Sequence, residues 1–167
     1  MHFSLVVLFA ASLVSALTII KRGIDGPECA VACEAKSNPS PCDREDTACL
    51  CLNIGYITSV SDCVRSSCSP EDAKAAALAE ATYCNEAGIN EQNPFPSCGA
   101  QCAQIAPFTN CAENNGACLC KNGAYMQAFV KCIHDFCTGE DLESASLVGE
   151  ALCRAYGVDI PPFDPQQ

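Results

Sequence analysis

The sequence predicts an all-α protein built from two small disulfide-rich units in tandem, and two observations carry this expectation. The chain has 16 cysteines in 167 residues, and the last eight repeat the gaps of the first eight, which are 3, 8, 6, 1, 11, 4 and 15 residues. Between the cysteines, apolar residues recur at helical spacing. The first set is Cys29, Cys33, Cys42, Cys49, Cys51, Cys63, Cys68 and Cys84, and the second is Cys98, Cys102, Cys111, Cys118, Cys120, Cys132, Cys137 and Cys153.

Each unit is too small to depend on a hydrophobic core alone, because it spans only 56 residues from first to last cysteine. Domains of that size are usually stapled, and this cysteine density is typical of a secreted disulfide scaffold. A zinc protein is the competing interpretation. It is disfavoured because the chain has no Cys-x-x-Cys pair and, after the N-terminal segment, a single histidine, His134.

The N-terminus supports a secretory route. Residues 1–16 are expected to be a signal peptide, because an apolar run ends in the small residues Ser15 and Ala16. The dibasic pair Lys21-Arg22 makes residues 17–22 a candidate pro-segment, with two solvated charges as the alternative.

The two units then occupy residues 23–93 and 94–167. The last seven residues, 161–167, lack the apolar tail of a glycolipid anchor signal. A released product without a membrane anchor is therefore expected.

The first helix of each unit is expected to begin beside a proline, Pro27 or Pro96, since proline suits the first helical turn. The first two cysteines of each unit lie four positions apart, on one face of that helix. Turn-rich segments follow at 37–41 and 106–110 and lead to the Cys-x-Cys pair.

Two longer helices complete each unit. The last one is expected to start where a hydroxyl precedes a carboxylate by three positions, in 69–72 and 138–141, and to run to the eighth cysteine. The segment after it, 85–97 in the first unit, is expected to be a tail that keeps the units close together. The helix before it is indicated by Tyr56, Val60, Cys63 and Val64, and in the second unit by Tyr125, Phe129, Cys132, Ile133 and Phe136.

The same residues argue against several classes of function. We expect no enzyme, because oxidised cysteines leave no thiolate and a single mature histidine cannot build the same catalytic site twice. Three carboxylates gather at Asp43, Glu45 and Asp46, but the second unit has only Glu113 there. A catalytic pair of carboxylates is therefore not repeated in the two units. The formal net charge of −11 disfavours nucleic acid and anionic membranes as partners.

The cysteine order resembles that of the CFEM domain, which is common in fungal extracellular membrane proteins. The matching features are Pro-x-Cys, Cys-x3-Cys, an aspartate three residues before Cys-x-Cys, and Cys-x4-Cys-x15-Cys. The cysteine features recur in both units and cover most of 27–153. Hydrophobins and plant lipid-transfer proteins differ, because both need adjacent Cys-Cys doublets. The resemblance implies two compact helical-basket domains with four disulfides each.

The resemblance also implies the pairing of the cysteines, which their number alone leaves open. It pairs the first with the seventh, the second with the sixth, the third with the fourth and the fifth with the eighth. The expected disulfides are Cys29–Cys68, Cys33–Cys63, Cys42–Cys49, Cys51–Cys84, Cys98–Cys137, Cys102–Cys132, Cys111–Cys118 and Cys120–Cys153.

CFEM domains that act as haemophores bind ferric haem, and the resemblance places the axial iron ligand at Asp46. A hard carboxylate oxygen suits Fe(III) better than Fe(II). A helix N-cap is the alternative role of this aspartate. The residues expected to form an apolar platform for haem, or alternatively part of the core, are Leu50, Leu52, Ile54, Tyr56 and Ile57.

The second unit departs from the pattern, because Asn115 stands where the aspartate is expected. A neutral amide is a poor ligand for ferric iron, so haem is expected in the first unit only. His134 is a candidate substitute ligand, although a lone histidine on a helix is more often solvated or hydrogen-bonded.

The expected function is that of a secreted, haemophore-like protein of iron acquisition. Its expected partners are haem or haem-carrying proteins, with other CFEM proteins or host proteins as further candidates. The alternative is a secreted effector, or a cell-wall or adhesion protein, that uses the same scaffold without haem.

Overall fold

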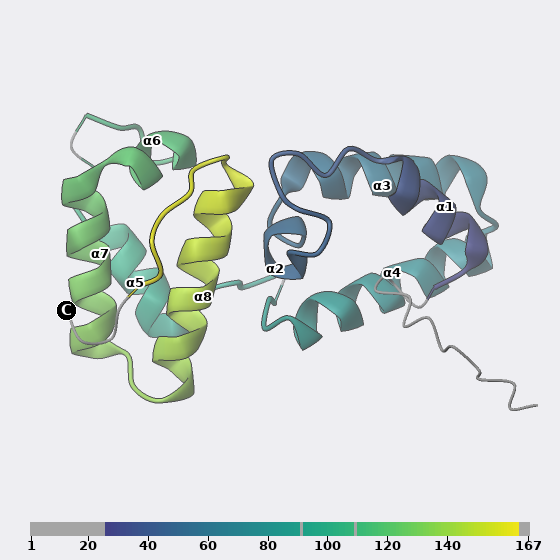
Figure 1. Ribbon diagram of the computed structural model, residues 1–167. Helices are drawn as coiled ribbons and strands as arrows, with labels where there is room; N and C mark the ends of the chain where they lie inside the picture. The colour runs from purple at the N-terminus through teal and green to yellow at the C-terminus, as the bar shows by residue number, and fades with distance from the viewer. Residues whose placement is uncertain (1–25, 91, 109, 164–167) are drawn as a thin grey trace, which may run out of the picture.

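The computed structural model describes residues 26–90, 92–108 and 110–163, and within them the chain is helical without strands, as predicted. No helix in these residues is both long and apolar enough to cross a membrane. Helices α1 to α4 form the first unit and α5 to α8 the second (Figure 1). They are α1 (Glu28–Lys36), α2 (Thr47–Leu50), α3 (Ile54–Ser67), α4 (Pro70–Glu86), α5 (Ser97–Ile105), α6 (Gly116–Lys121), α7 (Gly123–Phe136) and α8 (Glu140–Ala155).

Eight disulfides pair all sixteen cysteines, with four in each unit. In each unit two disulfides join the first helix to the end of the third or to its interior. One disulfide closes the loop before the short second helix, and one joins the end of the second helix to the fourth. The pairs match those that the family resemblance implies: Cys29–Cys68, Cys33–Cys63, Cys42–Cys49, Cys51–Cys84, Cys98–Cys137, Cys102–Cys132, Cys111–Cys118 and Cys120–Cys153.

Short polar side chains start several of the helices. Asn53 and Asn122 accept hydrogen bonds from the first turns of α3 and α7. Ser69 caps α4 through the backbone N–H of Asp72, as its sequence pattern predicts. The equivalent pattern at α8 does not work in that way, because Gly139, with a φ of 56°, turns the chain and is itself the N-cap. The Thr138 hydroxyl therefore lies one residue before the N-cap position and does not cap α8.

Each unit has a core between its first and third helices. In the first unit the core contains Tyr56, Val60 and Val64. In the second unit it is more aromatic, with Tyr125 and Phe129 as buried members.

A further cluster of buried residues joins the two units. Helix α2 packs against α8, and Ile89, from the tail that follows α4, is completely buried with them. Figure 1 shows α8 beside α2 where the units meet. The tail thus helps to hold the units together, as expected. The buried members of the cluster are Ala48, Cys51, Cys84, Ile89, Val148 and Ala151.

Candidate functional site

The loop that carries Asp46 is closed into a small covalent ring by a disulfide. The disulfide Cys42–Cys49 spans seven positions of sequence. Within the ring, Arg44 donates hydrogen bonds to backbone carbonyls at the C-terminal end of α1, the shortest being 2.8 Å, to the oxygen of Ser37. A guanidinium stabilises the negative end of a helix dipole, so this contact fixes the loop on α1.

Asp46 is the N-cap of α2, and its Oδ1 accepts a hydrogen bond of 3.1 Å from the backbone N–H of Cys49. The cap interpretation of this aspartate is therefore correct for the structure. Capping leaves lone pairs on both oxygens free for a second partner, so it does not exclude a ligand role.

The second partner of Asp46 comes from the other unit. Arg154, in the last turn of α8, approaches Oδ2 of Asp46 with Nε at 2.5 Å and Oδ1 with Nη2 at 3.3 Å. Both side chains are largely enclosed, with 32% of Arg154 and 24% of Asp46 exposed. A two-pronged guanidinium–carboxylate contact in such surroundings is stronger than an ion pair in open water.

The apolar cluster between the units includes residues of α2 and α8, the two helices whose ends carry this ion pair. Leu52 from the first unit and Leu147 from α8 pack on the cluster between the units. Beside them, the hydroxyl of Thr47 donates a hydrogen bond of 2.9 Å to the phenol oxygen of Tyr83. The face of the first unit next to Asp46 is thus covered by α8.

The structure does not bring the expected platform residues together on one surface. Leu50 and Tyr56 are buried in the core of the first unit. Leu52 lies in the cluster between the units, and Ile54 is 74% exposed. Ile57 is half-buried on α3.

Burial alters the chemistry of Tyr56. It raises the pKa of the Tyr56 phenol from its ordinary 10.0 to about 12, with a smaller contribution from the nearby Glu34 carboxylate. The phenol is therefore neutral at all physiological pH values.

The loop of the second unit has the same backbone but different partners. Asn115 caps α6 through the N–H of Cys118, as Asp46 caps α2. His134 is on α7, in a groove lined also by Ile160 and Phe163. Its Nε2 is buried and has no hydrogen-bond partner among the described residues. This groove is separate from the Asn115 loop.

No three histidine, cysteine, aspartate or glutamate side chains within residues 26–90, 92–108 and 110–163 are grouped to hold a metal ion. A single carboxylate such as Asp46 can contribute one ligand to a metal whose other ligands come from elsewhere, as in a porphyrin.

Sequence reasoning missed Arg154 as a residue of this site. A signal was present, because a basic residue follows the eighth cysteine of the second unit where neutral Asn85 follows that of the first. That difference between the copies gave no indication of which residue the arginine would contact, 108 positions away.

The comparisons with known proteins agree with the repeat. The family model of the CFEM domain matches twice, at residues 24–85 and 91–154. No solved structure matches the chain significantly.

Three curated proteins of Candida albicans are similar to parts of the chain. Cell wall protein 1 is 29% identical over 86 residues, which is 48% of this chain and 8% of that protein. The GPI-anchored hemophores PGA10 and RBT5 are 32% and 33% identical over 66 residues, 39% of this chain and 26% and 27% of their own lengths. The matches thus span about a quarter or less of these relatives.

Proposed function

Since the chain belongs to the CFEM domain family, we propose that it binds ferric haem outside the cell, through Asp46 in its first unit. The observation that carries the proposal is the position of Asp46, three residues before a Cys-x-Cys pair and inside the Cys42–Cys49 ring. Two of the relatives are named as hemophores, which supports haem as the ligand. The role is one of binding rather than catalysis, and haem or haem-carrying proteins are the proposed partners.

The donor chemistry of Asp46 fits the group. Haem iron in the ferric state supplies a hard cationic centre that accepts an axial oxygen ligand. The Cys49 N–H orients the Asp46 carboxylate through Oδ1. Hydrogen bonds of this kind hold a ligand in place and are part of how proteins tune a metal site.

In the docked arrangement of the two units, haem has no access to Asp46. Arg154 occupies both carboxylate oxygens, and α8 covers the neighbouring apolar face. Haem therefore requires Arg154 to leave Asp46 and the units to separate at α2 and α8. The proposed binding unit is the first, and the proposed binding state is the undocked one.

A hemin titration followed by visible absorbance tests this proposal. We expect the wild-type protein to take up one hemin per chain, and Asp46→Asn to lose that uptake while keeping its helical content. Asp43→Asn is the matched control, because it removes one charge from the same ring while its amide oxygen can still accept the local hydrogen bond that Glu45 N–H donates to Asp43. Equal uptake by the wild type and Asp46→Asn would refute the ligand role.

A second function is favoured by the covered Asp46 face and by the similarity to Cell wall protein 1. In this alternative the docked pair of units is the working form, and it serves as a cell-wall, adhesion or effector scaffold without haem. A wild-type protein that shows no Soret band with hemin, at any ratio, would support this alternative over the haem proposal.

A further inference from the structure

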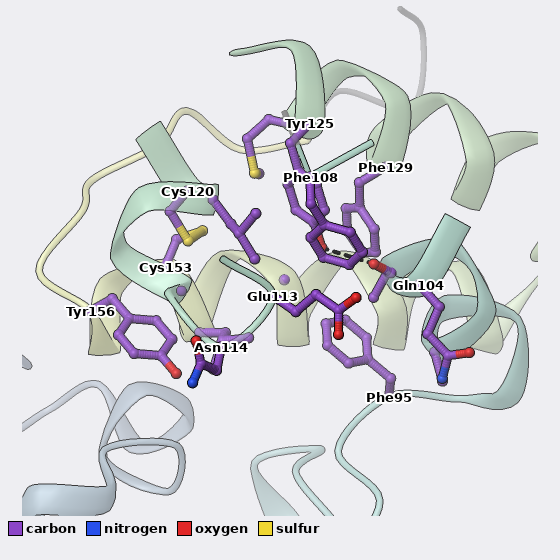
Figure 2. A pocket seen from close by; sticks show the side chains of 17 residues that line it. Phe95, Gln104, Phe108, Glu113, Asn114, Cys120, Tyr125, Phe129, Cys153 and Tyr156 are labelled. Atoms are coloured by element: carbon purple, nitrogen blue, oxygen red, sulfur yellow. Dashed lines mark hydrogen bonds between the residues drawn. A yellow bond between two sulfur atoms is a disulfide. The ribbon is translucent and has the colours of Figure 1, made fainter. Parts of the chain in front are cut away.

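The second unit contains a cavity of about 440 Å³ that haem binding at Asp46 does not use. It lies among α5, α6, α7 and α8. Buried Leu119, Tyr125 and Phe129 line it together with half-buried Phe95 and Phe108 (Figure 2). Small-molecule sites are mostly apolar clefts of roughly 300–1,000 Å³, so the cavity has the size and lining of one.

The aromatic rings of the cavity form a continuous series. The ring centroids of Phe108 and Tyr125 are 5.7 Å apart, and those of Tyr125 and Phe129 are 6.5 Å apart with planes inclined by 6°. Phe95 meets Phe129 edge-on at 5.8 Å. Aromatic surfaces of this kind favour flat, ring-containing ligands, which gain both burial and ring–ring contacts.

The phenylalanines of this lining belong to the second unit alone, whereas Leu119 and Tyr125 have identical counterparts, Leu50 and Tyr56, in the first. Every phenylalanine after residue 22 lies at position 95 or later. The side chain at the cavity mouth also differs, because Glu113 replaces the Arg44 that lies across the end of α1 in the first unit. The aromatic residues Phe95, Phe108 and Phe129 correspond, 69 positions earlier, to Gly26, Pro39 and Val60.

Two helical glycines make room for rings at this cavity. A Cβ on Gly116 would collide with the Tyr156 ring at the rim, and one on Gly149 would lie 3.0 Å from Cε1 of Phe129. The first unit has Thr47 and Glu80 at the equivalent positions. Gly149 lies inside α8, where glycine is a poor helix former, so its presence there is explained by the space that the Phe129 and Phe163 rings need.

The charges of the cavity restrict the ligand. Among the described residues that line it, Glu113 carries the one carboxylate, and none is lysine, arginine or histidine. The Tyr125 hydroxyl is already used, since it donates to the backbone oxygen of Ala103. An anion would meet Glu113 without a basic group to balance it, in a chain of net charge −11. A hydrogen-bond donor on the ligand would be attracted to the same carboxylate.

We propose that this cavity binds an uncharged, flat, ring-containing apolar molecule whose single hydrogen-bond donor reaches Glu113. Haem is disfavoured there, because its two carboxylates would face the same acidic mouth and Asn115 offers no iron ligand. The inference therefore stands independently of haem binding at Asp46.

Two fluorescent probes with the same ring system test it in the full chain. Phenylnaphthylamine is neutral and has one N–H donor, whereas anilinonaphthalene sulfonate is its anionic counterpart. We expect the neutral probe to bind with one site per chain and at least about tenfold more tightly than the anion. Glu113→Gln should reduce this ratio of affinities, because without the carboxylate the anionic probe should bind more tightly.

Cavity filling supplies the second arm of the test. Ala100→Trp places an indole at the cavity wall and should weaken the neutral probe by about tenfold or more. Val31→Trp is the equivalent change in the first unit and should leave the binding of the neutral probe unchanged. Asp46→Asn should also leave it unchanged. Circular dichroism and the absence of free thiols establish that each variant is folded.

Three results would overturn the inference. The neutral probe could bind Ala100→Trp as tightly as wild type, or the anionic probe could bind wild type as tightly as the neutral one. The third is a hemin uptake that Ala100→Trp abolishes and Asp46→Asn does not, which would assign the cavity to haem.

Discussion

Among the described residues, the Asp46 carboxylate has two hydrogen-bonding partners, the N–H of Cys49 and the guanidinium of Arg154. The first partner is local and would remain in a haem complex. The second competes directly with iron for the same oxygens. The strength of haem binding should therefore depend on a residue of the other unit as well as on Asp46 itself.

Replacing Arg154 tests this competition. Arg154→Ala frees the Asp46 oxygens and weakens the contact between α2 and α8, so it should raise hemin affinity by about tenfold, the equivalent of roughly 1.4 kcal/mol. Arg65→Ala, which breaks an exposed ion pair with Asp62 on α3, is the control and should change nothing. Unchanged or weaker hemin binding in Arg154→Ala would show that the ion pair does not compete with haem for Asp46.

Tyr56 provides a prediction about pH. Its pKa in the folded protein is about 12, against an ordinary 10.0, because burial disfavours the phenolate and Glu34 adds to that effect. The folded state thus keeps its proton where the unfolded chain has lost it. This contribution to stability is complete below pH 10 and is lost as the pH rises through about 12.

Absorbance titration of the phenolate measures this pKa. The difference between the wild-type curve and that of Tyr56→Phe isolates the Tyr56 transition, and its midpoint should lie near pH 12. A midpoint near the ordinary value would mean that Tyr56 is solvated in solution.

Among the structural elements, the Cys42–Cys49 ring and the helix-joining disulfides have different consequences. The ring closes a separation of 7 positions, whereas Cys29–Cys68 closes one of 39. A longer closed loop restricts the unfolded chain more, so it contributes more to stability. The ring instead positions Asp46 and the start of α2.

Two double variants separate these roles. Cys42→Ala with Cys49→Ala should cost about 2.5 kcal/mol of unfolding free energy, and Cys29→Ala with Cys68→Ala about 4 kcal/mol, by loop entropy. Urea denaturation measures both. Hemin uptake should nevertheless fall more in the ring variant, because the Asp46 loop is no longer pinned; the reverse order of uptake would contradict the positioning role of the ring.

The molecule as a whole is two disulfide-tied units that share a buried cluster. Val148 and Ala151 of α8 and Ile89 from the tail of the first unit are completely buried in this cluster. A fragment cut at Asn93 would expose these apolar side chains. We nevertheless predict that each unit folds on its own, because each holds its own set of four disulfides, and this shared surface is the main obstacle to it.

Val148→Asp is designed to separate the units without breaking either set of disulfides, because it buries an unpaired charge in the shared cluster. We expect a larger radius of gyration by small-angle X-ray scattering and faster proteolysis between residues 85 and 97. The same change at Leu78, which is 64% exposed on α4, should alter neither measurement. A compact Val148→Asp protein would show that the units remain docked by other contacts.

The cysteine spacing was sufficient to predict two units, and the apolar periodicity predicted their helices, because such features depend on residues close in sequence or on a pattern that occurs twice. The pairing of the cysteines, including the Cys42–Cys49 ring around Asp46, followed from the family resemblance and not from the spacing. The apolar platform was harder to predict, since periodicity cannot tell whether Leu50 or Tyr56 points into a core or onto a surface.

Contacts between the units required the three-dimensional arrangement. Arg154 meets Asp46 across 108 positions because the two units dock through α2 and α8, and no local pattern encodes the orientation in which they do so. The cavity of the second unit has the same origin. Its phenylalanines are visible in the sequence, but whether they fill a core or leave a space depends on how four helices and two glycines pack around them.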